Sequence, residues 1–177
     1  MKHLIVVFLL MSCSKGFSQE NQPEEKFKPH HSIGILLGHA QIRQGANEEN
    51  IKWLAMPSFA LDYNYSFSEK WSLGLHNDVV MESFKVESFD EEVIERDKPI
   101  ASVITAGFKP GNHFTYQLGL GAEFSKEENL ALARIGAEYG LEIKNNWEFI
   151  ANLVYDLKWN AYDSFGLSVG ISKSFGK

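Results

Sequence analysis

The chain has 177 residues, a formal net charge of −6 and one cysteine, Cys13. Its acidic balance argues against nucleic acid as a partner, because a phosphate backbone is bound by clusters of Lys and Arg. A single cysteine excludes an internal disulfide, and the length suits one domain.

Residues 1–18 have the pattern of a secretory signal peptide. Lys2 precedes an apolar run at residues 4–11, and the small residues Gly16 and Ser18 favour cleavage directly after the second of them. The run is much shorter than the roughly 20 apolar residues of a membrane-spanning helix. We therefore expect the leader to be removed.

Cys13 offers an alternative route of processing, because the residues around it loosely resemble a lipid-attachment site. Residues 19–31 are polar, contain two prolines and show no alternation, so we expect a periplasmic lead-in there. The folded domain, an outer-membrane β-barrel, is expected to fill residues 32–177.

Eight segments of the chain alternate apolar and polar residues with a period of two. Between Trp53 and Phe67 every second residue is apolar, whereas Asp62 and Asn64 lie on the other face. Successive side chains of a strand point to opposite sides, so each segment predicts a strand between an apolar and a polar environment. The predicted strands cover residues 32–42, 53–67, 71–84, 100–108, 114–124, 131–143, 147–157 and 164–175.

The glycines identify the polar face as the interior of a closed barrel. Glycine weakens a solvent-facing strand, but it gives room where side chains from opposite walls of a small barrel meet. The apolar face then points outward into lipid, whereas a soluble lipid-binding barrel would need the opposite orientation. We therefore predict an all-β fold, an eight-stranded antiparallel up-and-down transmembrane β-barrel. All glycines of the predicted strands lie on the polar face: Gly34, Gly38, Gly74, Gly107, Gly119, Gly121, Gly136, Gly140, Gly166 and Gly170.

The connections between the predicted strands alternate between short and long. Residues 68–70, 109–113 and 144–146 are tight turns, whereas residues 44–50 and 87–98 form longer connections. Outer-membrane barrels have short periplasmic turns and long extracellular loops, so both termini are predicted to be periplasmic.

With this pattern the chain resembles the small eight-stranded outer-membrane barrels of the OmpA and OmpX type, over the whole region after the leader. Barrels of that family end on an aromatic residue recognised during assembly. Phe175 resembles it, although Gly176 and Lys177 follow. The resemblance implies a monomer in the outer membrane of a Gram-negative bacterium, in contact with outer-membrane lipid and lipopolysaccharide. It also implies a role in envelope integrity, adhesion or surface binding; a few relatives are lipid-modifying enzymes or narrow conduits.

Charged side chains on the polar face predict ion pairs in the barrel interior, because charges removed from water need partners. Three-residue turns place Asp62 opposite His76 and Arg134 opposite Asp156. Glu123 is expected as a second partner of Arg134. The predicted network of the lumen consists of Asp62, His76, Asp78, Glu82, Glu123, Arg134, Glu138, Asp156 and Lys158.

The sequence favours other interpretations of these residues less. Asp62, His76, Asp78 and Glu82 would suit a cation or metal site, but no paired-ligand motif is present, so neither metal nor cofactor is predicted. Eight strands leave an interior just wide enough for side chains, which disfavours a channel. A His-x-Ser at residues 30–32 has no carboxylate that the pattern places beside it, so no catalytic residue is predicted.

The connection at residues 87–98 is the most distinctive predicted surface, with six acidic residues against Arg96 and Lys98. Such a charge run is typical of a solvated loop. Alternatively, the flanking strands continue as a hairpin whose edge binds a partner, or cations that bridge to lipopolysaccharide. The candidate residues of this surface loop are Phe89, Asp90, Glu91, Glu92, Val93 and Ile94.

Together these patterns predict a non-enzymatic barrel with a packed polar lumen, acting in envelope integrity or surface binding through its extracellular loops. Two alternatives stay open, a narrow conduit for small or apolar solutes and a lipid-modifying enzyme. The conduit would need a continuous void past His76 and Arg134. The enzyme would need a nucleophile with a base at the rim of the barrel.

Overall fold

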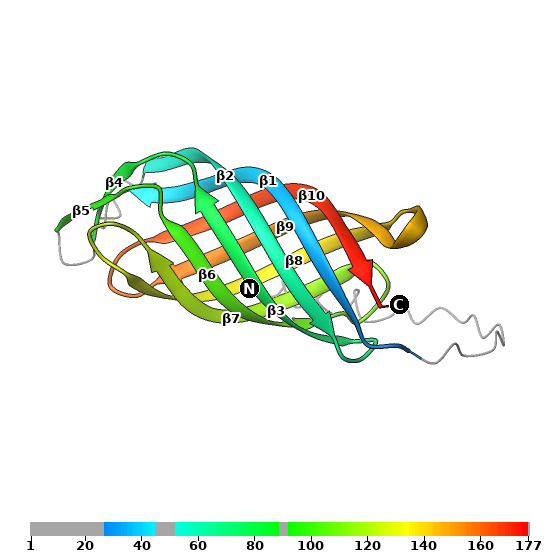
Figure 1. Cartoon of the computed structure of the whole chain (residues 1–177). Coiled ribbons are helices and arrows are strands. Elements are labelled where there is room, and N and C mark those ends of the chain that lie inside the picture. Colours follow the sequence, from blue (N-terminus) through cyan, green and yellow to red (C-terminus); the bar gives the residue numbers. More distant parts are fainter. Residues whose placement is uncertain (1–26, 45–51, 89–91, 177) are drawn as a thin grey trace, which may run out of the picture.

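The computed structural model describes residues 27–44, 52–88 and 92–176. Eight strands form a closed antiparallel barrel, and two short ones form a separate hairpin above one end (Figure 1). The predicted signal peptide, and the lead-in as far as residue 26, lie outside the described residues. The described residues contain no helix long and apolar enough to cross a membrane.

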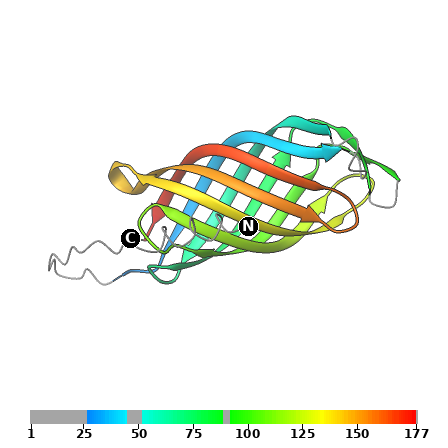
Figure 2. The ribbon, with the colours of Figure 1, turned by 180° about the vertical axis from the view of Figure 1, so that it is seen from behind.

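Each barrel strand pairs with its neighbour in the chain, and the first strand closes the ring by pairing with the last. At the seam His31 lies opposite Phe175 and Ile42 opposite Ser164. The strands are strongly tilted against the barrel axis, as the view from behind also shows (Figure 2). The barrel strands are β1 (His30–Gln44), β2 (Lys52–Ser66), β3 (Trp71–Val80), β6 (Ile100–Phe108), β7 (Phe114–Phe124), β8 (Leu130–Glu142), β9 (Trp147–Lys158) and β10 (Asp163–Phe175); the hairpin is β4 (Phe84–Glu87) and β5 (Val93–Arg96), and a 3₁₀ turn, η2 (Lys144–Asn146), precedes β9.

The predicted fold class is therefore confirmed, and so is the assignment of the two faces of the strands. Large apolar side chains form an exposed belt around the barrel, including Leu61, Tyr63, Leu73, Leu75, Leu118, Leu120, Leu153, Leu167 and Val169. An added Cβ at Gly38 or Gly170 would collide with the backbone of the strand across the β1–β10 seam. Glycine thus allows these two strands to approach closely at the seam.

Leu120→Arg tests the orientation of this belt. Leu120 lies in the middle of the lipid-facing row of β7 and is 72% exposed. A charged side chain near the bilayer midplane is expected to destabilise a barrel by about 2–4 kcal/mol. Reversible unfolding by urea in lipid vesicles measures this loss, with Leu120→Ala as the control for lost side-chain area. Equal stability of the two variants would contradict the orientation.

The third predicted strand is too long, because β3 ends at Val80 and the chain bends before β4 begins. The amide of Val80 donates to the carbonyl of Pro99 at 3.1 Å, and the amide of Met81 donates to Pro57 at 2.9 Å. Proline has no N–H to donate in return, so the ladder stops here. Glu82, predicted to face the lumen, is an exposed residue of this bend.

The interior contains apolar layers as well as polar ones. One buried cluster consists of Leu36, Ala60 and Ile150, and a second of Ala101, Val103 and Leu132. A third cluster fills the end of the barrel under the hairpin and includes Ile42, Met56, Phe84, Val86, Leu130, Ala161 and Tyr162. Beside the predicted polar groups, inward positions between the glycines thus also hold branched apolar side chains.

Candidate functional site

The middle of the barrel is bridged by Arg134, which projects inward from β8 and is almost completely buried. As the turn geometry predicts, it lies opposite Asp156 on β9. Its Nε donates to Oδ1 of Asp156 at 2.6 Å, and its Nη2 donates to Oδ2 at 2.7 Å. This is the two-point geometry in which a guanidinium binds a carboxylate most strongly.

The second carboxylate on Arg134 is Asp78, which corrects the prediction of Glu123. Nη1 of Arg134 donates to Oδ2 of Asp78 at 2.6 Å, so the guanidinium connects β8 and β9 to β3 across the lumen. Gly119 is the residue of β7 directly opposite Arg134. Glu123 lies four residues further along β7, toward the hairpin, where it meets a different arginine.

That arginine is Arg96 of β5, which is 0% exposed although it follows an acidic loop. Its Nε and Nη2 donate to Oε1 of Glu123 at 2.9 and 2.7 Å, and its Nη1 donates to the carbonyl of Glu128 at 2.7 Å. The hairpin is therefore attached to the inner wall of the barrel by a buried ion pair with Glu123 on β7.

Tyr162 and Lys158 complete this second network around Glu123. The Tyr162 hydroxyl lies 2.7 and 2.9 Å from the two oxygens of the Glu123 carboxylate and donates to it. Burial raises the pKa of Tyr162 well above its usual value, and the charge of Glu123 raises it further, so the hydroxyl keeps its proton. Lys158 Nζ lies 3.5 Å from Glu123 and donates to Ser164 Oγ at 2.6 Å.

The sequence offered weak signals for the two residues that were missed, Arg96 and Tyr162. Phe84 and Val86 on β4 are buried while Lys85 between them is exposed, and Arg96 directly faces Phe84 in the hairpin. A period of two is thus present in the loop, but the many acidic residues conceal it. Tyr162 belongs to a short connection and packs edge-on against Phe84, with ring centroids 5.8 Å apart.

The proposed cation ligands do not come together in the part of the chain that the structure describes. Asp62 lies opposite His76 as predicted, but Oδ2 of Asp62 is 3.8 Å from Nδ1 of His76. Nε2 of His76 lies 3.0 Å from Oδ1 of Asn64 instead. Asp78 is bound by Arg134 and Glu82 is outside the lumen, and no three His, Cys, Asp or Glu side chains among these residues are placed to hold a metal.

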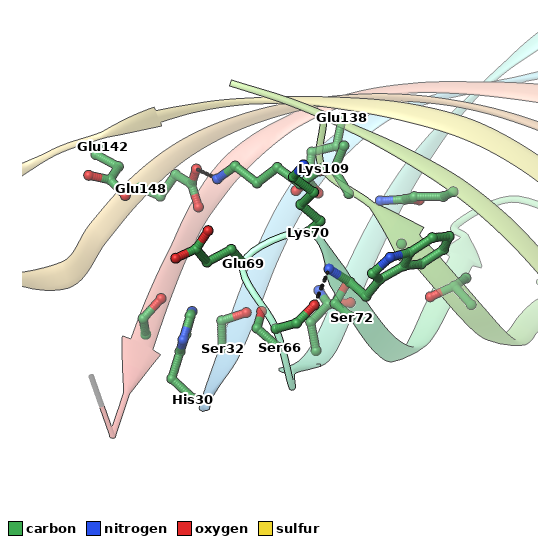
Figure 3. A pocket seen from close by; sticks show the side chains of 18 residues that line it. His30, Ser32, Ser66, Glu69, Lys70, Ser72, Lys109, Glu138, Glu142 and Glu148 are labelled. Carbon is green, nitrogen blue, oxygen red and sulfur yellow. Dashed lines mark hydrogen bonds and ion pairs between the residues drawn. The ribbon is translucent and has the colours of Figure 1, made fainter. Parts of the chain in front are cut away.

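The end of the barrel at which β1 begins and β10 ends opens into a polar cavity of about 90 Å³ (Figure 3). Glu138 of the predicted network lines it, next to Lys109, which lies 3.9 Å from Glu148. Ser32 and His30 also lie on its wall, and Nδ1 of His30 donates to the carbonyl of Lys28 at 3.0 Å. On the side of the barrel interior the cavity is bounded by Asn64, Thr105 and Gln117.

The fold has counterparts among solved structures, although no protein-family model matches the sequence and no curated protein resembles it in sequence. The attachment invasion locus protein Ail of Yersinia pestis, in complex with the heparin analogue sucrose octasulfate, superposes with a TM-score of 0.54; it is 18% identical over 85% of this chain and 99% of Ail. Neisserial surface protein A superposes with a TM-score of 0.52; it is 10% identical over 82% of this chain and 97% of that protein. This chain has the fold of the small eight-stranded outer-membrane barrels. At these identities the likeness is one of fold.

In this barrel the predicted surface loop becomes the β4–β5 hairpin. Phe89, Asp90 and Glu91 lie outside the described residues. Val93 is 72% exposed at the start of β5, whereas Ile94 packs against the apolar cluster beneath the hairpin. Glu92 is exposed, and its amide donates to Ser88 Oγ at 3.2 Å. One face of the hairpin therefore closes the barrel and the other face is presented outward.

Proposed function

We propose that this protein is a monomeric, non-enzymatic barrel in the outer membrane of a Gram-negative bacterium, and that it acts at the cell surface through the β4–β5 hairpin. The observation that carries this proposal is the buried attachment of Arg96 to Glu123. A solvated loop has no need of a fully buried arginine. A hairpin that presents a binding surface gains from being held, because less conformational freedom is lost when the partner binds.

The charge of the hairpin supports a cationic bridge to lipopolysaccharide as the mode of binding. Glu87, Glu92, Glu95 and Asp97 lie on or beside the two short strands. Lys85 and Lys98 are the exposed basic residues described there, and Lys85 is paired with Glu95 at 3.2 Å. Carboxylates and phosphates both bind hard divalent cations such as Ca²⁺ and Mg²⁺. Ail was solved with a polysulfated sugar; here the acidic hairpin would need cations between itself and the anionic groups of lipopolysaccharide.

Binding of lipopolysaccharide to the barrel in nanodiscs, with Ca²⁺ and then with a chelator, tests this mode. We expect the triple variant Glu87→Gln, Glu92→Gln, Glu95→Gln to bind at least tenfold more weakly in Ca²⁺, and the chelator to abolish the difference. Glu127→Gln is the matched control, since it removes an exposed carboxylate from the β7–β8 connection at the same end of the barrel. Binding that persists unchanged in the triple variant would refute the cationic bridge.

The filling of the lumen argues against the conduit alternative. The Arg134 network, the Arg96 network and three apolar clusters succeed one another along the interior. We therefore expect planar bilayers containing the protein to show no ion conductance above that of bilayers without it. Reproducible single-channel steps of the wild-type protein would instead favour a conduit.

A further inference from the structure

A hollow on the outer surface of the barrel lies over β2 and β3, near the end at which β1 begins and β10 ends. It has a volume of about 460 Å³, and its walls are His31, Tyr63, Tyr65, Leu73, Leu75 and Ile104, with Gly74 in the floor. We propose that this hollow, the acyl groove, binds one acyl chain of a phospholipid of the periplasmic leaflet, with His31 and Tyr63 at the headgroup end. This inference is independent of the proposed role of the hairpin.

The strand register gives the acyl groove its direction. One row of paired residues runs from His31 through Tyr65 to Leu73, and the next runs from Tyr63 through Leu75 to Ile104. The groove therefore begins at the rim where β1 starts and crosses β2 and β3 to the middle of β6. Three inter-strand spacings of about 4.8 Å give a length of about 14 Å. Because the strands are strongly tilted against the barrel axis, only part of this length runs along the membrane normal, so the groove stays within one leaflet of a hydrocarbon core about 30 Å thick.

The far end of the acyl groove is apolar and continuous with the lipid-facing belt. Leu73, Leu75 and Ile104 are 52%, 42% and 62% exposed, and all three belong to outward rows of their strands. Gly74 points inward, and an added Cβ there would meet Asn64, Thr105 and His76, so the outer floor beneath the chain is bare backbone. A hydrocarbon chain suits such a concave apolar surface within a membrane, where lipid is the surrounding solvent.

The near end of the acyl groove is polar and ordered. Nδ1 of His31 and the hydroxyl of Tyr63 share a hydrogen bond of 2.7 Å, and the His31 ring stacks on Tyr65 with centroids 4.8 Å apart. Rings with one apolar side and one polar atom favour the boundary between hydrocarbon and headgroups. An apolar groove that ends in donors at the interface matches a whole phospholipid better than a free fatty chain in the membrane interior.

Native mass spectrometry of the full mature protein, extracted from nanodiscs of phosphatidylethanolamine and phosphatidylglycerol, tests the site. We expect one phospholipid to remain bound after the surrounding lipids are stripped. Leu75→Trp fills the acyl groove and is expected to lower retention at least tenfold. Leu153→Trp is the matched control, because Leu153 is a similarly exposed leucine on β9 outside the groove.

A second measurement needs no variant and covers the case in which Leu75→Trp does not fold. Nuclear Overhauser contacts from lipid chain protons to the methyl groups of Leu73, Leu75 and Ile104 should be at least several-fold stronger than contacts to Leu153 and Leu167. Equal retention in both Trp variants, or equal contacts at all five positions, would overturn the proposal. Loss of every phospholipid together with the surrounding lipids would overturn it as well.

Discussion

Replacing Arg134 with Met is expected to destabilise the barrel by about 3–5 kcal/mol, the usual cost of removing one partner from a buried ion pair. The loss would leave Asp78 and Asp156 facing each other in the lumen without the guanidinium that now lies 2.6 Å from each. Unfolding by urea in detergent micelles or lipid vesicles, followed by tryptophan fluorescence, measures the change. Arg43→Met is the matched control: Arg43 is partly exposed, its nearest approach to Asp163 is 3.8 Å, and its loss should cost less than about 1 kcal/mol.

The partnership itself is tested by combining Arg134→Ala with Asp156→Ala. Each single change leaves a buried charge uncompensated, so the double variant should lose less stability than the two single variants added together. Both variants that lack Arg134 also leave the carboxylate of Asp78 without its partner, so the double variant does not recover the full stability of the wild type. Simple additivity would mean that the two side chains do not interact, and that the lumen is wetter than its packing indicates.

Strand parity and turn length are sufficient to predict the interior pairs that lie next to tight turns. A turn of three residues fixes which positions face each other, and the faces then follow for the whole hairpin. For this reason Asp62 opposite His76 and Arg134 opposite Asp156 could be placed without coordinates. The partner Asp78 could not, because it reaches Arg134 across the lumen from a strand that is not a neighbour.

The closure of the barrel by the hairpin was beyond prediction for a different reason. Arg96 belongs to the β4–β5 ladder, which is separate from the sheet of the barrel, and Tyr162 belongs to the connection between β9 and β10. The register of the barrel strands therefore does not extend to either residue. Pro57 and Pro99 end the β2–β3 and β3–β6 ladders at Met81 and Val80. The alternation of apolar and polar residues continues in the sequence beyond this point, so counting it as far as Glu82 wrongly predicted that Glu82 faces the lumen. Inward apolar residues such as Val103 were hidden as well, since a period of two shows which face a residue occupies but not what fills the space opposite.

Arg134 and Arg96 hold different parts of the structure together, so their loss should have different effects. Arg134 joins three strands of the wall, so its loss acts on the stability of the whole barrel. Arg96 joins the hairpin to the wall, and the strands of the barrel remain paired without it. A change at Arg96 should therefore alter the surface and the closure of the barrel before it alters the fold.

Arg96→Met is accordingly expected to release the hairpin locally, at a cost of about 3 kcal/mol, the low end for a broken buried pair because Tyr162 and Lys158 still hold Glu123. At 1.4 kcal/mol for each factor of ten, this corresponds to amide hydrogen exchange about a hundredfold faster in β4 and β5. Exchange in β7 and β8 should change little. Hydrogen–deuterium exchange of the protein in nanodiscs measures both regions in one experiment.

Arg96→Lys separates the charge of Arg96 from its geometry. Lysine keeps the positive charge but cannot contact Glu123 and the carbonyl of Glu128 with one planar group. The rate of amide hydrogen exchange in β4 and β5 of Arg96→Lys should therefore lie between the rates of the wild type and Arg96→Met. The same release would withdraw Phe84 and Val86 of β4 from the mouth of the barrel, which they now fill. If hairpin exchange in Arg96→Met equals that of the wild type, the apolar face of the hairpin holds it alone, and the attachment on which the proposed surface role depends is not the ion pair.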